Sequence, residues 1–168
     1  AWQGVDLARF AVEKLHYQKV AILYQQDEEY SKGLAEVFEE EINNLGGKVL
    51  AKEVYFRGDT DFGEQIKRIK EKDPELIFVP GYTKQAILIL QQMKKLGVES
   101  VQFLGGDGIG SPEFINLGGE AVEGVIATFF FDTKTPDPKV RKFVEDYLRV
   151  YKEEPSWIAA HAYDATWI

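Results

Sequence analysis

Three side chains able to bind a charged, partly apolar small molecule follow predicted strands: Tyr30, Tyr82 and Asp107. A carboxylate in a partly desolvated loop forms charge-assisted hydrogen bonds with ammonium groups, and tyrosine combines an apolar ring with a hydroxyl. Gly106 precedes the carboxylate, and the aromatic run 129–131 lies nearby. We therefore take Tyr30, Tyr82, Gly106 and Asp107 as candidate ligand-binding residues. Alternatively, the tyrosines are ordinary edge residues and Asp107 caps the helix that follows it.

The apolar pattern predicts alternating helices and strands that would position these residues. Apolar residues spaced for one helical face alternate with short continuous apolar runs, and turn residues separate them. The predicted strands are 19–24, 49–56, 75–80, 101–104 and 124–131. The residues that define the predicted helices, by apolar stripe or cap, fall within 7–15, 34–45, 59–69, 84–96, 111–118, 137–150 and 157–168.

Strands rich in Val, Ile, Leu and Phe, each followed by a helix, imply a parallel sheet, because parallel strands need crossover connections. The sequence therefore predicts an α/β fold. It consists of a doubly wound, mainly parallel five-stranded sheet with helices on both faces, Rossmann-like or flavodoxin-like, in a single lobe spanning residues 1–168. Asp59 and Asp61 are interpreted as caps of the third helix, and Ser111 and Asp137, each followed by proline, begin two later helices.

The fold class also predicts where a ligand would lie. In doubly wound sheets, ligands bind beyond the carboxyl ends of the strands, near the point where the strand order reverses. The loops at these ends are 25–30, 81–83, 105–110 and 131–135. The four candidate residues fall within these loops, so we expect the site to draw on them.

Catalytic chemistries and phosphate binding fit the loops poorly. The loop GGDGIG (105–110) lacks GxGxxG spacing, follows a late strand and contains Asp107, which would repel a phosphate. Its glycines alternatively mark a tight turn that needs positive φ. The strand ends offer neither the acceptor aspartate of a phospho-receiver nor a flavin-type phosphate loop. Because GxSxG is absent and His16 and His161 fall on predicted helices, we expect no enzyme activity.

Composition narrows the functional classes further. With 168 residues, 45% of them hydrophobic, the chain is the size of one domain. Its net charge of −8 argues against nucleic acid or an anionic membrane as a partner. The lack of cysteine excludes disulfides, thiol nucleophiles and zinc ribbons. The acidic clusters 27–29 and 39–41 match no ligand spacing, so we expect no metal and no cofactor.

The chain offers no segment for membrane insertion or secretion. Its most apolar run, 86–90, is far shorter than the roughly 20 residues that a membrane span needs. The first residues do not form a basic and then apolar signal sequence, so we expect an already processed chain if the protein is secreted. The content of Glu and Lys is typical of a thermophilic source.

Short motifs along the chain resemble one family throughout. In chain order they are KVAILY (19–24), YSKGL (30–34), GDTDF (58–62), IFVPGY (77–82), FLGGDG (103–108), EG (123–124) and AYDA (162–165). The sequence is similar to the C-terminal lobe of type I periplasmic binding proteins. Among them it most resembles the leucine/isoleucine/valine-binding group, which serves branched-chain amino acid ABC transporters. The resemblance runs from about residue 3 to residue 165.

The resemblance implies a role for each candidate residue. It implies that Tyr30 closes over the ligand, that Tyr82 contacts it and that Asp107 pairs with its α-ammonium group. The chain departs from the family at Ser31, where glycine is frequent, and at Asp107, where some members have glutamate. Substitutions of this size can change selectivity, so the exact ligand stays open.

The larger departure is length, because family members have two lobes with the ligand between them. The missing N-terminal lobe would hold the ligand carboxylate. We therefore expect an excised or engineered lobe, or a fragment surviving proteolysis, that binds weakly or not at all alone. Trp2, Trp157 and Trp167 lie near the chain ends, where the hinge and the missing lobe would be. Newly exposed apolar surface there would favour a homodimer.

The expected function is that of a ligand-binding lobe of a periplasmic or extracellular solute-binding protein. Its ligand would be an amino acid of the branched-chain type, which the full-length parent would deliver to an ABC transporter permease. The alternative is a ligand-sensing or scaffold module of receptor type with no transport role, since the same fold serves receptors.

Overall fold

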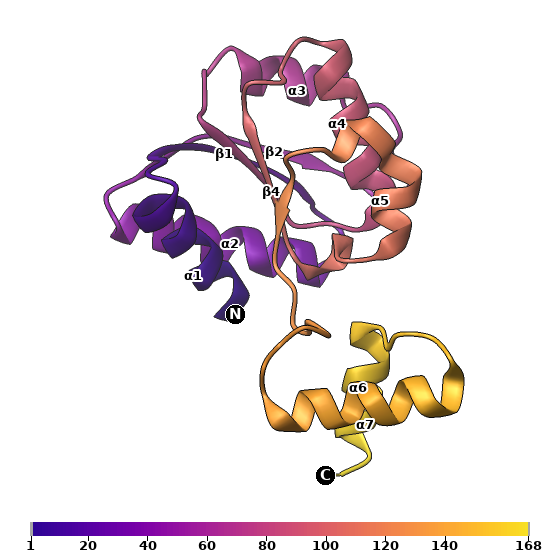
Figure 1. Ribbon diagram of the computed structural model, residues 1–168. Helices are drawn as coiled ribbons and strands as arrows, with labels where there is room; N and C mark the ends of the chain where they lie inside the picture. The colour runs from indigo at the N-terminus through magenta and orange to yellow at the C-terminus, as the bar shows by residue number, and fades with distance from the viewer. Residues whose placement is uncertain (1, 168) are drawn as a thin grey trace. The chain divides into compact units, whose positions relative to one another are not determined.

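The structure, a computed structural model, describes residues 2–167 and divides the chain into two compact units, Ala1–Thr128 and Phe129–Ile168 (Figure 1). In chain order the elements are α1 (Trp2–Arg9), the π-helical turn η1 (Phe10–Lys14), β1 (Lys19–Gln25), α2 (Glu29–Asn44), β2 (Lys48–Tyr55), α3 (Gly63–Lys70), β3 (Leu76–Val79), α4 (Thr83–Lys95), β4 (Gln102–Gly105), the 3₁₀ turn η2 (Asp107–Ile109), α5 (Pro112–Gly118), the 3₁₀ turn η3 (Gly119–Val122), β5 (Ile126–Ala127), α6 (Pro138–Tyr151) and α7 (Trp157–Ala165).

The first unit is built on a five-stranded sheet with the order β2-β1-β3-β4-β5, and every neighbouring pair is parallel. The strand order reverses between β1 and β3, which pair through Val20 and Leu76. Leu76 in turn pairs with Gln102 of β4, so the three central strands end at the same edge of the sheet. The prediction of a doubly wound, parallel α/β fold is confirmed.

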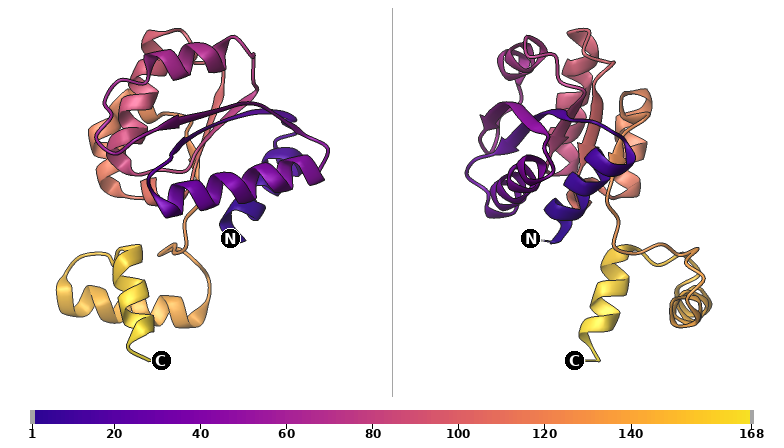
Figure 2. Two further views of the ribbon diagram at one scale, coloured as in Figure 1. Left: turned by 180° about the vertical axis from the view of Figure 1, so that it is seen from behind. Right: turned by 90° about the vertical axis from the view of Figure 1, so that its left-hand side faces the viewer.

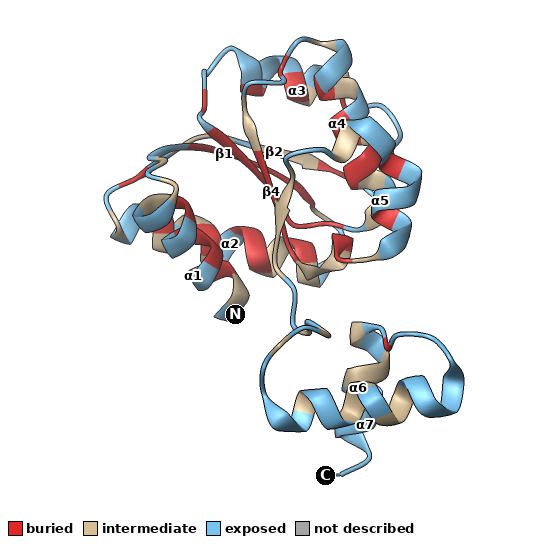
Figure 3. Ribbon diagram, viewed as in Figure 1, coloured by how far each residue is buried: buried red, intermediate tan, exposed pale blue. Residues whose placement is uncertain are grey.

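Helices cover both faces of this sheet (Figures 1 and 2). α1 and α2 lie on one face, where the ring of Phe38 stacks on that of Phe78 at a centroid distance of 4.1 Å. α3, α4 and α5 lie on the other face, where Ile66 and Phe103 belong to a second core. All residues of β3 are buried, as expected for a central strand covered on both sides. Figure 3 shows that the buried residues gather in the sheet and in the helices beside it.

Two predicted elements are shorter in the structure. The predicted strand 124–131 is reduced to Ile126–Ala127, which pair with Leu104 and Gly105. It does not continue because β4 ends at Gly105 and the chain turns into η2 at Asp107. The third helix begins at Gly63 rather than at residue 59. Asp59 instead accepts the Phe56 amide in the preceding turn at 2.8 Å, so of the two predicted caps only Asp61 pairs with a helical amide, that of Gly63.

Two other helices begin five residues before their predicted apolar stripes, α1 at Trp2 and α2 at Glu29, whereas α4 (Thr83–Lys95) agrees to within one residue. The predicted helix 7–15 is divided between α1 and η1. Ser111 and Asp137 cap α5 and α6 as predicted. The final helix ends at Ala165, and residue 168 lies outside the described residues.

The second unit consists of α6, α7 and the segments around them. The ring of Phe143 contacts those of Phe131 and Tyr163, with centroids 5.8 Å and 4.7 Å apart. No residue of either helix is buried. A groove of about 580 Å³ runs beside this aromatic cluster. Among the helices that the structure describes, none is long and apolar enough to cross a membrane.

Candidate ligand-binding site

The sheet brings three of the predicted residues together at its carboxyl edge. Tyr30 lies in the first turn of α2 after β1, Tyr82 precedes α4 after β3, and Asp107 begins η2 after β4. The Tyr30 hydroxyl donates to Asp107 Oδ1 at 2.6 Å, and the Tyr30 and Tyr82 rings are 5.5 Å apart between centroids. This cluster therefore lies at the point where the strand order reverses, as expected for ligand sites in such sheets.

The glycines of the loop after β4 let other groups approach the backbone closely. A Cβ added to Gly106 would lie 2.5 Å from the Tyr30 hydroxyl, and one added to Gly108 would lie 2.5 Å from the Gly81 carbonyl oxygen. The φ of Gly106 is −85°, and no glycine of residues 105–110 has a positive φ. The alternative interpretation of this loop as a turn that needs positive φ is therefore wrong. Gly106 contributes to the site by leaving room for Tyr30.

Asp107 does not cap the helix after it, so the alternative reading of this residue is also wrong. Ser111 caps α5 by accepting the Phe114 amide at 3.2 Å. The Asp107 carboxylate instead accepts two side-chain donors on Oδ1, the Tyr30 hydroxyl and Gln3 Nε2 at 2.7 Å. Within residues 2–167, Oδ2 receives no donor, and no lysine or arginine forms an ion pair with this carboxylate. The carboxylate is thus oriented but uncompensated, which suits it to accept a cationic donor.

The two tyrosines remain neutral over the ordinary pH range. Burial raises the pKa of Tyr30, and the hydrogen bond to Asp107 raises it further. Burial also raises the pKa of Tyr82, as does the nearby charge of Glu28. Tyr30 therefore keeps the proton that it donates to Asp107, and both rings present neutral aromatic surface to the site.

Sequence reasoning missed Gln3 and Thr128. Gln3 Nε2 donates both to Asp107 Oδ1 and to Thr128 Oγ1, the latter at 2.5 Å. Gln3 lies in the first turn of α1, and Thr128 follows β5. Neither residue belongs to a motif, and they are far from Asp107 in sequence, so only the fold reveals this contact.

Ser31, which departs from the glycine frequent in the similar family, has a structural role here. Its side chain is buried, and its hydroxyl accepts the Gln25 amide at 2.9 Å and donates to the Pro80 carbonyl. The start of α2 is thereby tied to the ends of β1 and β3. This anchoring fixes the turn of helix that carries Tyr30.

The hydroxyl of Tyr55 is buried near the site, as that of Ser31 is. Its hydroxyl is the buried side-chain atom without a hydrogen-bond partner among the described residues. A Cβ on Gly81 would lie 2.7 Å from this hydroxyl. Its ring packs edge-on against Phe62 with centroids 5.3 Å apart, and burial raises its pKa.

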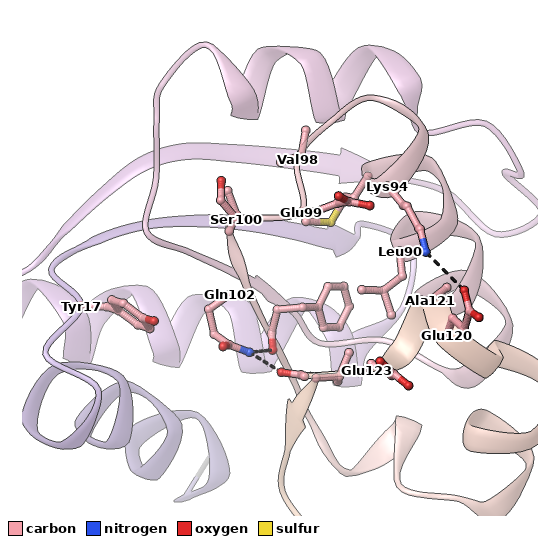
Figure 4. A pocket seen from close by; sticks show the side chains of 15 residues that line it. Tyr17, Leu90, Lys94, Val98, Glu99, Ser100, Gln102, Glu120, Ala121 and Glu123 are labelled. Atoms are coloured by element: carbon pink, nitrogen blue, oxygen red, sulfur yellow. Dashed lines mark hydrogen bonds and ion pairs between the residues drawn. The ribbon is translucent and has the colours of Figure 1, made fainter.

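A groove adjoins the tyrosine cluster, and a separate pocket lies at the other end of β4. Tyr82 and Gly108 line a groove of about 570 Å³ together with Ile87 of α4 and Leu117 of α5. A pocket of about 260 Å³ surrounds Gln102, at the opposite end of β4 from Asp107 (Figure 4). The described residues contain no group of three or more His, Asp or Glu side chains placed to hold a metal ion.

Comparison with known proteins gives a consistent assignment. The model of the periplasmic binding protein family matches residues 1–168. The chain is 28% identical over 158 residues to a leucine-, isoleucine-, valine-, threonine- and alanine-binding protein of Pseudomonas aeruginosa, covering 93% of this chain and 41% of that protein. It is 30% identical over 164 residues to a Leu/Ile/Val-binding protein homolog of Brucella abortus, covering 96% of this chain and 42% of that protein.

Solved structures show the same relationship. A leucine-binding protein from Thermotoga maritima superposes with a TM-score of 0.91 at 36% identity, over 98% of this chain and 47% of that one. A branched-chain amino acid transporter substrate-binding protein from Streptococcus pneumoniae, solved with isoleucine, superposes with a TM-score of 0.85 at 33% identity. The match covers 97% of this chain and 46% of that one. The chain thus spans less than half the length of these relatives. It belongs to the periplasmic binding protein family and resembles one lobe of the type I members that bind branched-chain amino acids.

Proposed function

We propose that the chain is the ligand-binding lobe of an extracytoplasmic solute-binding protein for an amino acid of the branched-chain type. The observation that carries this proposal is the Asp107 carboxylate, which Tyr30 and Gln3 orient through one oxygen while the other oxygen receives no donor within the described residues. A ligand of the branched-chain type is supported by the relatives, which include a leucine-, isoleucine-, valine-, threonine- and alanine-binding protein and a leucine-binding protein.

In this proposal the cluster makes two kinds of contact with the ligand, one ionic and one apolar. The α-ammonium group pairs with Asp107 Oδ2, and the rings of Tyr30 and Tyr82 contact the apolar part of the ligand. None of the four candidate residues, Tyr30, Tyr82, Gly106 and Asp107, is basic and able to pair with the α-carboxylate. We therefore expect that the part of the relatives' length that this chain does not span supplies those contacts, and that the chain alone binds weakly.

The proposed role is non-catalytic and lies in the periplasm or outside the cell. The full-length parent would deliver the amino acid to an ABC transporter permease. Transport is favoured over a receptor-type sensing or scaffold role because a relative at 33% identity is a transporter substrate-binding protein. A permease whose ATPase activity does not respond to the full-length parent and ligand would favour the sensing role instead.

The exposed aromatic surface of the second unit supports the proposal of a homodimer. Its exposed apolar side chains are Phe129, Phe130, Leu148, Val150, Tyr151, Ile158, Tyr163 and Trp167. An exposed apolar surface of this kind favours self-association. Light scattering should show a mass that rises with concentration, and a monomer throughout would contradict this proposal.

Calorimetric titration tests the ligand-binding proposal directly. Leucine, isoleucine and valine should bind the chain, and Asp107→Asn should remove at least nine-tenths of the affinity, a loss of about 1.4 kcal/mol or more, as expected for a hydrogen bond to a charged group. Asp6→Asn, a change of the same type at an exposed residue of α1, serves as the matched control and should leave binding unchanged. Equal binding by both variants would contradict the assigned role of Asp107.

A further inference from the structure

One side chain links the proposed ligand carboxylate to the end of the first unit. The two protons of Gln3 Nε2 point to different acceptors, one to Asp107 Oδ1 at 2.7 Å and the other to Thr128 Oγ1 at 2.5 Å. The acceptors lie 104 and 125 residues away from Gln3 in the sequence. Because an amide nitrogen has two protons, this bridge uses its full donor capacity.

The backbone that carries Gln3 is held firmly against the fold. The next residue, Gly4, is buried, and a Cβ there would lie 3.2 Å from both the Leu34 carbonyl oxygen and Val37. α1 therefore packs on α2 without space between them at this point. This packing fixes the backbone position from which the Gln3 side chain reaches Asp107 and Thr128.

Gln3 also contacts the end of β5, a strand that is held to the sheet by few backbone pairs. β5 has only two residues, and its pairs with β4 are Leu104–Ile126 and Gly105–Ala127. Thr128 follows directly and is the last residue of the first unit. The hydrogen bond from Gln3 is thus a side-chain tether at the point where the sheet pairing stops.

The other end of the bridge continues through the site. Asp107 Oδ1 also accepts the Tyr30 hydroxyl, and the Gly108 amide donates to that same hydroxyl at 3.2 Å. The contacts form a continuous path from Thr128 through Gln3, Asp107 and Tyr30 to the Gly108 amide. A change at one end alters the acceptors and donors available at the other.

We infer that Gln3 is a positioning residue that couples the Asp107 carboxylate to Thr128. It holds Oδ1 so that Oδ2 faces an incoming cation, a step that rests on the proposed function. A cation that neutralises the carboxylate weakens the charge-assisted bond from Gln3, because a charged acceptor binds a donor more strongly than a neutral one. Occupancy of the site is thereby transmitted to the end of β5.

A pair of Thr128 variants tests the coupling without any ligand. Thr128→Val keeps the shape of the side chain but removes the hydroxyl that accepts Gln3, whereas Thr128→Ser keeps the hydroxyl. Amide hydrogen exchange, measured by NMR, should be about five-fold faster at Gly108 in Thr128→Val, the size expected for the loss of one hydrogen bond. Thr128→Ser should exchange at the wild-type rate, as should the control Thr60→Val, which alters an exposed threonine of the same unit.

Gln3→Ala provides a second route to the same result and should raise Gly108 exchange to a similar extent. Combined with Thr128→Val it should add nothing further, because both changes break the same bridge. Faster exchange confined to residues 126–128 in Thr128→Val, with Gly108 unchanged, would overturn the inference.

Leucine addition then tests the link to binding separately. In the wild-type chain, saturating leucine should alter exchange at Thr128, and in Gln3→Ala this response should be lost. A response that persists in Gln3→Ala would overturn the coupling even though binding itself stands. If leucine does not bind the wild-type chain, the proposed contact of the isolated lobe with the ligand fails, and the ligand-free comparison at Gly108 still decides the coupling.

Discussion

Replacing Gly106 by alanine should destabilise the first unit because the added methyl group enters space that the Tyr30 hydroxyl occupies. The new Cβ would lie 2.5 Å from that hydroxyl, 3.4 Å from Leu34 Cδ1 and 3.5 Å from Gln3 Oε1. The ring of Tyr30 must therefore shift, and its hydrogen bond to Asp107, now 2.6 Å long, is lost. The φ of −85° suits alanine, so the backbone itself adds no strain.

The magnitude follows from two opposing effects. Losing a hydrogen bond to a charged acceptor costs about 1.5–3 kcal/mol. Replacing glycine by alanine at a compatible backbone conformation returns about 0.4–1 kcal/mol through the unfolded chain. We therefore expect Gly106→Ala to lower the free energy of unfolding by about 1–2 kcal/mol.

Urea unfolding followed by circular dichroism measures this change, with Gly33→Ala as the matched control. A Cβ on Gly33 meets nothing within 4 Å, and the residue lies inside α2, so this variant should be more stable by about 0.5–1 kcal/mol. Combining Gly106→Ala with Tyr30→Phe should remove most of the steric conflict, and the two changes should be less than additive. Equal stability of Gly106→Ala and Gly33→Ala would refute the reasoning.

Three further predictions concern groups around the site and the sheet. Ser31→Ala should lower the free energy of unfolding by about 2–3 kcal/mol, because a buried amide and a buried carbonyl lose their partner; denaturation in urea would show no change if the hydroxyl were dispensable. Tyr55→Phe removes a buried hydroxyl that has no partner among the described residues, so its melting temperature should equal or exceed the wild-type value, and a clear decrease would contradict this account. Hydrogen bonds from the backbone amides of Lys19 and Gln18 lower the pKa of Glu75 in the folded protein. Its contribution to the free energy of unfolding is therefore fully present above the ordinary glutamate pKa of about 4.3 and is lost as the pH falls through the lower pKa of the folded state. Glu75→Gln should therefore lose less stability than the wild type between neutral and acidic pH, and parallel pH profiles would argue against the assignment.

The sequence predicted where the candidate residues lie because it predicted where the strands end. Alternating helices and apolar strands imply a parallel sheet, and parallel strands direct their carboxyl ends to one edge. This reasoning placed Tyr30, Tyr82 and Asp107 in loops at that edge, and the structure joins Tyr30 to both of the others. Long sequence separations did not matter here because each residue directly follows its own strand.

Other contacts could not be predicted because no local pattern encodes them. Gln3 is an ordinary polar residue in an amphipathic helix, and its contact with Thr128 depends on how α1 packs on the sheet. The apolar run 126–131 resembles a strand, but the sheet offers it no partner beyond Gly105. For Gly106, the sequence suggests a backbone constraint without showing whether it is a positive φ or a close approach, and only the structure identifies the approaching hydroxyl.

The most direct test of the central claim is an NMR titration that compares two derivatives of leucine. Leucinamide keeps the ammonium group and lacks the carboxylate, whereas N-acetylleucine keeps the carboxylate and lacks the ammonium group. If Asp107 is the ammonium acceptor, leucinamide should shift the amide resonances of Gly106 and Gly108 in the wild-type chain, N-acetylleucine should not, and Asp107→Asn should abolish the response. Equal shifts with both derivatives, or a response that survives Asp107→Asn, would contradict the account.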